Sequence, residues 1–397
     1  MFFHYSNSRL ALARGFLWAF SYVLPMLASS AALAAIEITD ISGRVVTLEA
    51  PAHRLVIDDG RLLIALALIS ADPVGLVAAW PHDVNRLGEK TYEAYRAHSP
   101  AIETLPKIAN SAESFALEPI VAAKPDVALF TAGTGPTAEQ VAQMEALGIR
   151  VVFIDFFAHP FQNAEPSLAI LGKVIGREDA AKAFVNFRQA HLGHIRDVLA
   201  KAGDFARPNV FLEVHAGMSE DCCNSPGKGN VGDYVELVGG HNIGADVLSG
   251  PSGRLNLEYV IARNPDLYIA TGGPHFAKTG GFVLGPGYDA AAAKASLAKI
   301  AARPGIASLE AVKQRRVFGL MHQLLNSPID LVAAEVLASF IHPELFSAAD
   351  AQKTLDELNQ KFLAVPVTGT LWTGLADAAP PPAAAKASGD AEAKCDH

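Results

Sequence analysis

The sequence predicts an α/β protein of two Rossmann-like lobes, each with a central parallel sheet, joined by one long rigid helix with the ligand cleft between the lobes. Three observations predict this fold class. Short β-rich apolar runs alternate with helical patterns, the alternation starts again after a gap, and the gap holds a long amphipathic segment.

The first lobe is expected over residues 35–165. Its helical patterns stop at Gly or Pro, as in Leu147-Gly148 and Lys124-Pro125, where a helix does not easily continue. The predicted strands are Arg54–Ile57, Pro73–Ala79, Val127–Thr131 and Val151–Ile154, and the predicted helices are Gly60–Ile69, Phe115–Ala123 and Thr137–Leu147.

The second lobe is expected over residues 204–375, after an inter-lobe helical linker over 166–203. Within the linker, Asp179–Ala200 has no Pro and only Gly193, and its apolar residues recur at helical spacing. Such a helix is stiff, so it would let the lobes rock slightly without swinging far apart. The predicted strands of this lobe are Asn209–Val214, Leu267–Thr271 and Arg316–Leu320, and the predicted helices are Gly232–Val238, Leu257–Ala262 and Ile329–Ile341.

The two ends of the chain predict export and a free tail. Residues 1–34 have the pattern of a signal peptide, with Arg9 and Arg14 before an apolar run and small residues near Ala34, so we expect cleavage there and a soluble, monomeric periplasmic protein. The Ala/Pro-rich residues 376–397 are expected to be disordered. A net charge of -9 without a basic block offers no surface for nucleic acid.

Several different short motifs follow one another along the chain. They are Ile38-Thr39-Asp40, Gly43-Arg44-Val45-Val46, Leu117-Glu118-Pro119-Ile120, Lys124-Pro125-Asp126-Val127, Gly239-Gly240-His241-Asn242, Leu257-Glu258-Tyr259-Val260, Asn264-Pro265-Asp266-Leu267 and Ile341-His342-Pro343-Glu344. In this order and spacing the chain resembles the helical-backbone periplasmic binding proteins that deliver iron-siderophores, haem or cobalamin to ABC importers. The loop Asp58-Asp59-Gly60-Arg61 departs from the short polar stretch with Glu that many relatives carry.

The resemblance implies a non-enzymatic binding subunit of an importer. Such a protein captures a metal chelate, most typically a ferric siderophore, and passes it to an inner-membrane permease, without a cofactor or catalytic residues of its own. Glu118 and Glu258, each shortly before a Pro-Asp pair that starts a strand, match the glutamates with which the family contacts arginines of the permease. They are therefore the predicted docking residues.

The ligand-binding residues are predicted from their position after strands, because ligands of parallel α/β sheets bind beyond the carboxyl ends of the strands. Several histidines follow predicted strands, and imidazole is a common metal ligand. Arginines there suit anionic oxygens of a chelate, and aromatic residues could form walls. The predicted set is Arg61, Trp80, His82, Arg86, Tyr92, His159, His215, Cys222, Cys223, Arg254, His275, His322 and Asn326.

Cysteine use and motif searches leave several alternatives open. Adjacent Cys222 and Cys223 could close a vicinal ring or leave a free thiol, while the remaining Cys395 lies in the tail. The same fold could carry cobalamin or haem, or bind a bare transition-metal ion or a metal-histidine complex directly through His82, His159, His215 and His322. A secreted hydrolase is disfavoured, because the sequence contains no GxSxG, HExxH, phosphate-loop or CxxC motif.

Overall fold

A computed structural model of the chain describes residues 35–376, apart from 110, 204, 220 and 221. The described residues belong to one compact unit that begins at Ala35. The predicted signal peptide, nearly all of the predicted tail and Cys395 lie outside the described residues.

The first sheet has four parallel strands in the order β4-β3-β5-β6. Its predicted strands are confirmed, although β4 begins at Val77 rather than Pro73, because the Gly75 N–H donates to Asp72 in a turn that precedes the strand. The hairpin of β1 (Ile36–Thr39) and β2 (Val45–Leu48) comes before it. The other elements are β3 (Leu55–Ile57), α1 (Leu62–Ile69), β4 (Val77–Ala79), α2 (Val84–Leu87), α3 (Glu89–His98), α4 (Leu117–Ala122), β5 (Val127–Thr131), α5 (Ala138–Ala146) and β6 (Arg150–Ile154).

The second sheet has the order β13-β12-β11-β7-β9, and only its edge strand β13 runs antiparallel. In both sheets the first parallel strand along the chain lies between the second and the third, so the two sheets share one topology. The elements are β7 (Asn209–Glu213), β8 (Asn224–Pro226), α8 (Gly232–Leu237), β9 (His241–Asn242), β10 (Ser252–Arg254), α9 (Leu257–Arg263), β11 (Leu267–Gly272), α10 (Ala290–Ala301), α11 (Glu310–Lys313), β12 (Val317–Met321), α12 (His322–Leu325) and β13 (Trp372–Gly374).

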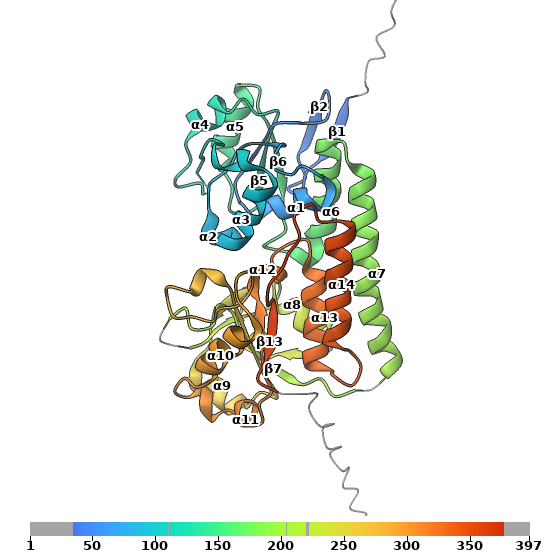
Figure 1. Cartoon of the computed structure of the whole chain (residues 1–397). Helices are drawn as coiled ribbons and strands as arrows, with labels where there is room; N and C mark the ends of the chain where they lie inside the picture. Colours follow the sequence, from blue (N-terminus) through green and yellow to red (C-terminus); the bar gives the residue numbers. More distant parts are fainter. Residues whose placement is uncertain (1–34, 110, 204, 220–221, 377–397) are drawn as a thin grey trace, which may run out of the picture. The chain divides into compact units, whose positions relative to one another are not determined.

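The long inter-lobe helix is confirmed as α7 (Glu178–Ala202), but it does not stand alone. It packs against α6 (Pro160–Ile175) and α13 (Asp330–Ile341), and α14 (Ala348–Lys361) packs on α13 (Figure 1). After α14 the chain reaches the first lobe, where the Ala364 N–H donates to Ala67 O, before it returns to the second sheet as β13. The chain thus contacts the first lobe again late in the sequence, and the lobe boundaries expected from the sequence, 35–165 and 204–375, remain a prediction.

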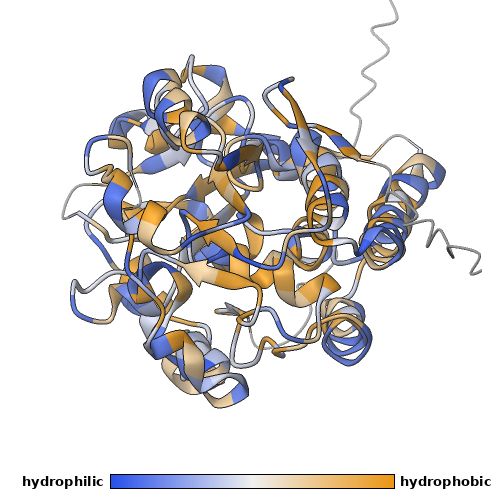
Figure 2. Ribbon diagram, turned by 90° about the horizontal axis from the view of Figure 1, so that it is seen from above, coloured by the Kyte–Doolittle hydropathy of each residue, from blue (hydrophilic) through white to orange (hydrophobic). Residues whose placement is uncertain are grey.

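Burial explains which helices lie inside. Every residue of α1 and all but one residue of α13 is buried, as expected for helices that are apolar on nearly all sides. Figure 2 shows hydrophobic residues gathered on the strands and inner helices and hydrophilic residues on the outer helices. In the described part of the chain, no helix combines the length and apolar character needed to cross a bilayer.

Candidate functional site

The loop after β3 carries a charged cluster at the carboxyl end of the first sheet. Arg61 forms a two-pronged ion pair with Asp59, with Nε to Oδ1 at 2.9 Å and Nη2 to Oδ2 at 2.7 Å. Arg86, at the end of α2, donates to the same Asp59 oxygen from 2.9 Å. Burial alone would raise the pKa of Asp59. The hydrogen bonds and charge of Arg61, together with the charge of Arg86, outweigh burial and lower this pKa. Two guanidinium groups therefore share one carboxylate.

Two further carboxyl groups lie in this cluster and hold their protons more tightly. Burial, with the Asp59 charge adding to it, raises the pKa of Asp58 to about 7, although the Thr131 N–H and hydroxyl both donate to it. Burial and the charge of Asp59 also raise the pKa of Asp83 to about 6. Asp83 Oδ1 accepts the Gly60 N–H at 3.0 Å, whereas its buried Oδ2 has no hydrogen-bond partner among the described residues. Near pH 7 Asp59 and most of Asp83 are ionised and Asp58 is about half ionised, so the carboxylates offset the charge of the two guanidinium groups.

Three histidines meet at the carboxyl ends of β7, β11 and β12 in the second sheet. The His215 ring centroid lies 4.0 Å from that of His322 and 5.5 Å from that of His275. Burial, then His275 and Arg61, lower the pKa of His215 to about 4, and burial lowers the pKa of His275. His322 is 7% exposed, and burial followed by its charged and imidazole neighbours holds its pKa well below the usual value. All three imidazoles are therefore neutral at physiological pH.

Arg61 and Phe157 connect the charged cluster of the first lobe with the histidines of the second. The Arg61 guanidinium lies 3.8 Å from the Phe157 ring centroid, a cation–π contact, and its charge contributes to the lowered pKa values of His215 and His322. From the second lobe, Asn230 Nδ2 donates to Phe157 O at 3.3 Å. A loop of the second lobe thus contacts the first lobe at Phe157, beside Arg61.

The other predicted residues of the first lobe lie in different surroundings. Trp80, expected as a ligand wall, has no exposed surface, because its indole packs in the core and donates to Ile102 O at 3.3 Å. His82 and Tyr92 stack on Trp80 with centroids 4.6 and 6.0 Å away, and His82 Nε2 bonds Leu105 O. His159 is exposed at the start of α6. Trp80 therefore packs against two of the predicted ligand residues, His82 and Tyr92.

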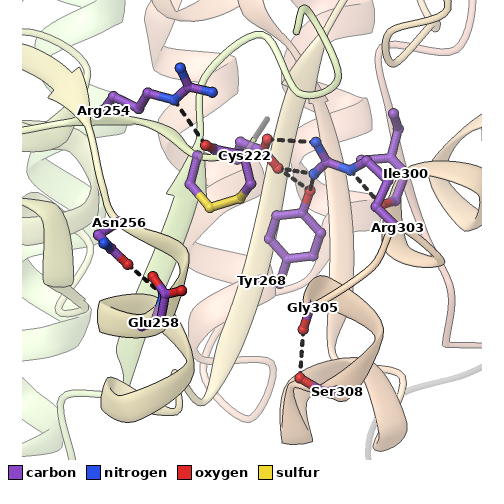
Figure 3. The surroundings of a disulfide bond; sticks show 11 residues. Cys222, Arg254, Asn256, Glu258, Tyr268, Ile300, Arg303, Gly305 and Ser308 are labelled. Atoms are coloured by element: carbon purple, nitrogen blue, oxygen red, sulfur yellow. Dashed lines mark hydrogen bonds and ion pairs between the residues drawn. A yellow bond between two sulfur atoms is a disulfide. The ribbon is translucent and has the colours of Figure 1, made fainter. Parts of the chain in front are cut away.

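Cys222 and Cys223 form a disulfide, which resolves the two alternatives that the sequence left open. Cys223 is fully buried, and Arg254 Nε donates to Cys222 O at 3.0 Å (Figure 3). Both Cys222 and Arg254 line a cavity of about 520 Å³ that Glu258 and Arg303 also border. The structure brings these two predicted ligand residues together with a predicted docking residue, in a cavity that none of the site histidines lines.

The two predicted docking glutamates occupy equivalent places in the two lobes. Glu118 is the second residue of α4, which leads into β5, and Glu258 is the second residue of α9, which leads into β11. Both side chains are exposed. β5 and β11 are the third strands of sheets with the same strand order, so the equivalence inferred from the sequence extends to the fold.

The histidines of the direct-metal alternative do not form one set. Among the residues that the structure describes, no group of three or more His, Cys, Asp or Glu side chains is arranged to hold a metal ion. His215 and His322 lie together, while His82 and His159 belong to separate loops of the first lobe.

Sequence reasoning missed several polar groups around the histidines. Thr271 Oγ1 accepts the His215 N–H at 3.0 Å and lies 3.1 Å from His322 Nδ1. Gln323 Nε2 donates to His275 Nδ1 at 3.1 Å, and Asn326 Nδ2, on a residue that was predicted, donates to His322 Nε2 at 2.9 Å. Gln323 directly follows a predicted site histidine, which was the one local signal that could have found it.

Two parallel-sheet lobes, whose strand-end loops converge on charged, aromatic and imidazole groups, define a two-lobed ligand-binding protein. The family model described as "Periplasmic binding protein" matches residues 66–324, and the chain belongs to this family. Membership implies a periplasmic location and a small-molecule ligand. The resemblance stated from the sequence motifs is thereby confirmed.

Solved structures agree with this assignment. The TroA-like periplasmic binding protein FepB from Veillonella parvula matches with a TM-score of 0.76 and 27% identity over 85% of this chain and 99% of that chain. The molybdate periplasmic binding protein MolA of Haemophilus influenzae matches with a TM-score of 0.63 and 19% identity, over 84% of this chain and 99% of that chain. A periplasmic haem-binding protein from Pseudomonas aeruginosa matches with a TM-score of 0.54 and 19% identity, over 81% of this chain and 98% of that chain. At 19% identity, the last two share the fold.

Proposed function

We propose that the protein captures an anionic metal chelate, such as a ferric siderophore, in the periplasm and delivers it to the inner-membrane permease of an ABC importer. The observation that carries this proposal is the position of Arg61, which lies over the Phe157 ring and within electrostatic reach of His215 and His322 from the other sheet. A ligand that contacts both this arginine and these histidines would touch both lobes.

The two guanidinium groups at this site, and not the net charge of the cluster, favour an anion. Asp59 is the one carboxyl group of the cluster whose pKa is lowered, and it faces both Arg61 and Arg86. Asp58 and Asp83 have raised pKa values of about 7 and 6, so near pH 7 Asp58 is about half ionised and Asp83 is mostly ionised. Arginine forks bind carboxylate and similar oxygen pairs through two hydrogen bonds, which suits the anionic rim of a chelate.

The neutral histidines and the aromatic ring suit the bulk of such a ligand. Neutral imidazoles add no charge to the site, and Phe157 offers a flat apolar surface. In this proposal the protein binds and releases its ligand without chemical change. Glu118 and Glu258 then register the two lobes on the permease, through exposed charges that act on orientation and encounter rate.

Tryptophan fluorescence titration tests the ligand class. The probes are ferric complexes of a tris-catechol amide, a trihydroxamate and citrate, the same chelators without iron, haem, cobalamin, and free Ni²⁺ and Zn²⁺. We expect saturable binding of at least one ferric complex at micromolar concentration or below. Arg61→Gln should weaken that binding at least tenfold, about 1.4 kcal/mol.

Arg150→Gln is the matched control, because Arg150 is exposed at the amino end of β6, away from the strand ends that form the site. It should bind like the wild type. Binding of no ferric complex, or tight binding of a free metal ion alone, would overturn the proposal. Binding of haem or cobalamin in place of the ferric complexes would reassign the ligand within the same transport role.

We also propose that residues 1–34 direct export and are removed near Ala34. The apolar run and the small residues at its end support this. Expression of the full chain in a bacterium, followed by intact-mass measurement of the periplasmic fraction, should give a protein that begins at about Ala35. A periplasmic protein that retains Met1 would contradict the proposal.

A further inference from the structure

Two carboxamide side chains hold the imidazoles of the second lobe. Gln323 Nε2 donates to His275 Nδ1, and Asn326 Nδ2 donates to His322 Nε2. An amide N–H donor at a ring nitrogen occupies the lone pair that a metal ion would need. The other ring nitrogen of His322 bonds Thr271 Oγ1, so both nitrogens of that imidazole are engaged. These histidines are arranged as parts of a hydrogen-bond network.

The same two amides leave their oxygens unused. Gln323 Oε1 and Asn326 Oδ1 are buried, and neither has a hydrogen-bond partner among the described residues. Leaving a buried carbonyl oxygen unpaired costs about 1–3 kcal/mol, so proteins rarely keep such groups without a use. Here two of them occur three residues apart, beginning on α12 directly after the carboxyl end of β12.

Both oxygens belong to the region where the lobes converge. Each amide is bonded to a histidine of the cluster at the carboxyl ends of β7, β11 and β12. A ligand that contacts these histidines would therefore lie next to the amides. Carbonyl oxygens accept hydrogen bonds and cannot donate them, so the ligand must supply the N–H or O–H groups.

We infer that the second lobe recognises the ligand through donors on the ligand's own periphery, which bind Gln323 Oε1 and Asn326 Oδ1, and not through bonds from His275 or His322 to its metal. This inference rests on the proposed function and narrows it. The ligand class becomes an anionic chelate whose organic shell carries amide N–H or hydroxyl groups, with its metal already fully coordinated.

Glycine 273 provides a second way to disturb the same network. A Cβ placed on Gly273 would lie 2.8 Å from Gln323 Oε1 and 2.9 Å from the His275 ring. The Gly273 backbone is extended, with φ 174°, so any residue can adopt its conformation and Gly273→Ala acts only by crowding these two side chains. It should weaken ligand binding without altering the charges of the site.

The experiment compares Gln323→Met, Asn326→Leu and Gly273→Ala with the wild type, using whichever ferric complex binds best. Met and Leu have nearly the size of the side chains they replace and lack the amide. Each variant should bind about tenfold more weakly, while Gln314→Met, a control at the exposed residue that follows α11, should bind normally. Thermal melting in the absence of ligand shows which variants are folded, and only folded variants are compared.

Two further readouts separate the inference from a purely structural role. The visible charge-transfer band of the ferric complex should keep the same wavelength free and bound, because no imidazole enters the iron coordination. An analogue of the same chelator with its peripheral amide N–H groups methylated should lose about tenfold in affinity for the wild type and little for Gln323→Met, because that variant no longer offers the acceptor.

The outcomes are distinct. If the wild type binds a ferric complex but the variants bind equally well, or if binding shifts the charge-transfer band, the inference is overturned and the proposed function stands. If the wild type binds none of the ferric complexes, the proposed function is overturned and the inference falls with it.

Discussion

The buried guanidinium of Arg188 should be among the most sensitive side chains in the protein. Its Nε and Nη2 donate to the two oxygens of Asp330 at 2.7 and 2.6 Å, and Nη1 donates to Glu165 at 2.6 Å. The Arg188 side chain is 3% exposed and that of Asp330 is 0% exposed. Because these residues belong to α7, α6 and α13, the network fastens the inter-lobe helix to helices on either side.

Arg188→Met would leave Asp330 buried with only the Tyr234 hydroxyl donating to it. Removal of one partner of a buried ion pair costs about 3–5 kcal/mol. The contact with Glu165 adds little, because the Glu165 side chain is 25% exposed and such pairs contribute about 0–1 kcal/mol. We therefore expect a loss of about 4 kcal/mol in the free energy of unfolding, roughly a thousandfold in the folding equilibrium.

Urea unfolding followed by circular dichroism and by tryptophan fluorescence would measure this loss, provided that the two signals coincide and the m-value is unchanged. Arg196→Met, at an exposed position on the same helix, should change stability by less than about 0.5 kcal/mol. The double variant Arg188→Met/Asp330→Leu should lose at least about 2 kcal/mol less than the sum of the single variants. A cost under about 1 kcal/mol for Arg188→Met, or additive losses, would refute the reasoning.

Three further predictions concern charge, docking and oxidation. The folded pKa of Asp58, about 7, lies above its unfolded value of 3.8, so its contribution to stability is complete below pH 4 and is lost as pH rises through 7. Thermal melts should thus show a fall in stability from pH 5 to pH 8 that Asp58→Asn reduces, by up to about 3 kcal/mol, and an unchanged slope would count against burial as the cause. Glu118→Lys and Glu258→Lys should keep wild-type ligand affinity but fail to stimulate the ATPase of the reconstituted importer, and weakened ligand binding would argue against a docking role. Thiol titration of the denatured, unreduced protein should detect one thiol, and three after reduction, because Cys222 and Cys223 are bonded to each other; three thiols before reduction would refute the disulfide.

Strand positions could be predicted where local and long-range signals agree. β5 (Val127–Thr131) matches the prediction at both ends, because Pro125 and Asp126 precede an apolar, β-branched run that is buried throughout. The helical linker predicted over 166–203 includes only the second part of α6 (Pro160–Ile175); its start at Pro160 was not predicted, and Pro166 and Gly172 disfavour a helix by local rules. Tertiary packing forms it nevertheless, since Leu168, Leu171 and their apolar neighbours are buried.

From the sequence, only those residues of the candidate site that follow strands closely could be predicted. His215, His275 and His322 lie one to three residues after the ends of their strands, so their meeting follows from the order of the sheet. The identity of the residues that contact these histidines does not follow from the strand order. Thr271 and His322 are separated by 51 positions and meet only because β11 and β12 pair in one register. The burial of Trp80 likewise depends on elements that pack around it, which no local pattern encodes.

The two lobes solve the same structural problem with different chemistry. In each sheet the loop after the first strand is bonded to the threonine of the third: Asp58 accepts from Thr131, and the His215 N–H donates to Thr271. This bond fixes the loops on either side of the crevice where α/β sheets bind ligands. In the first lobe the fixed loop leads to Arg61 and carries charge, whereas in the second it leads to neutral imidazoles. In this proposal the guanidinium groups of the first lobe would bind the anionic edge of the ligand, and hydrogen bonds in the second lobe, which form only at contact, would decide which ligand is retained.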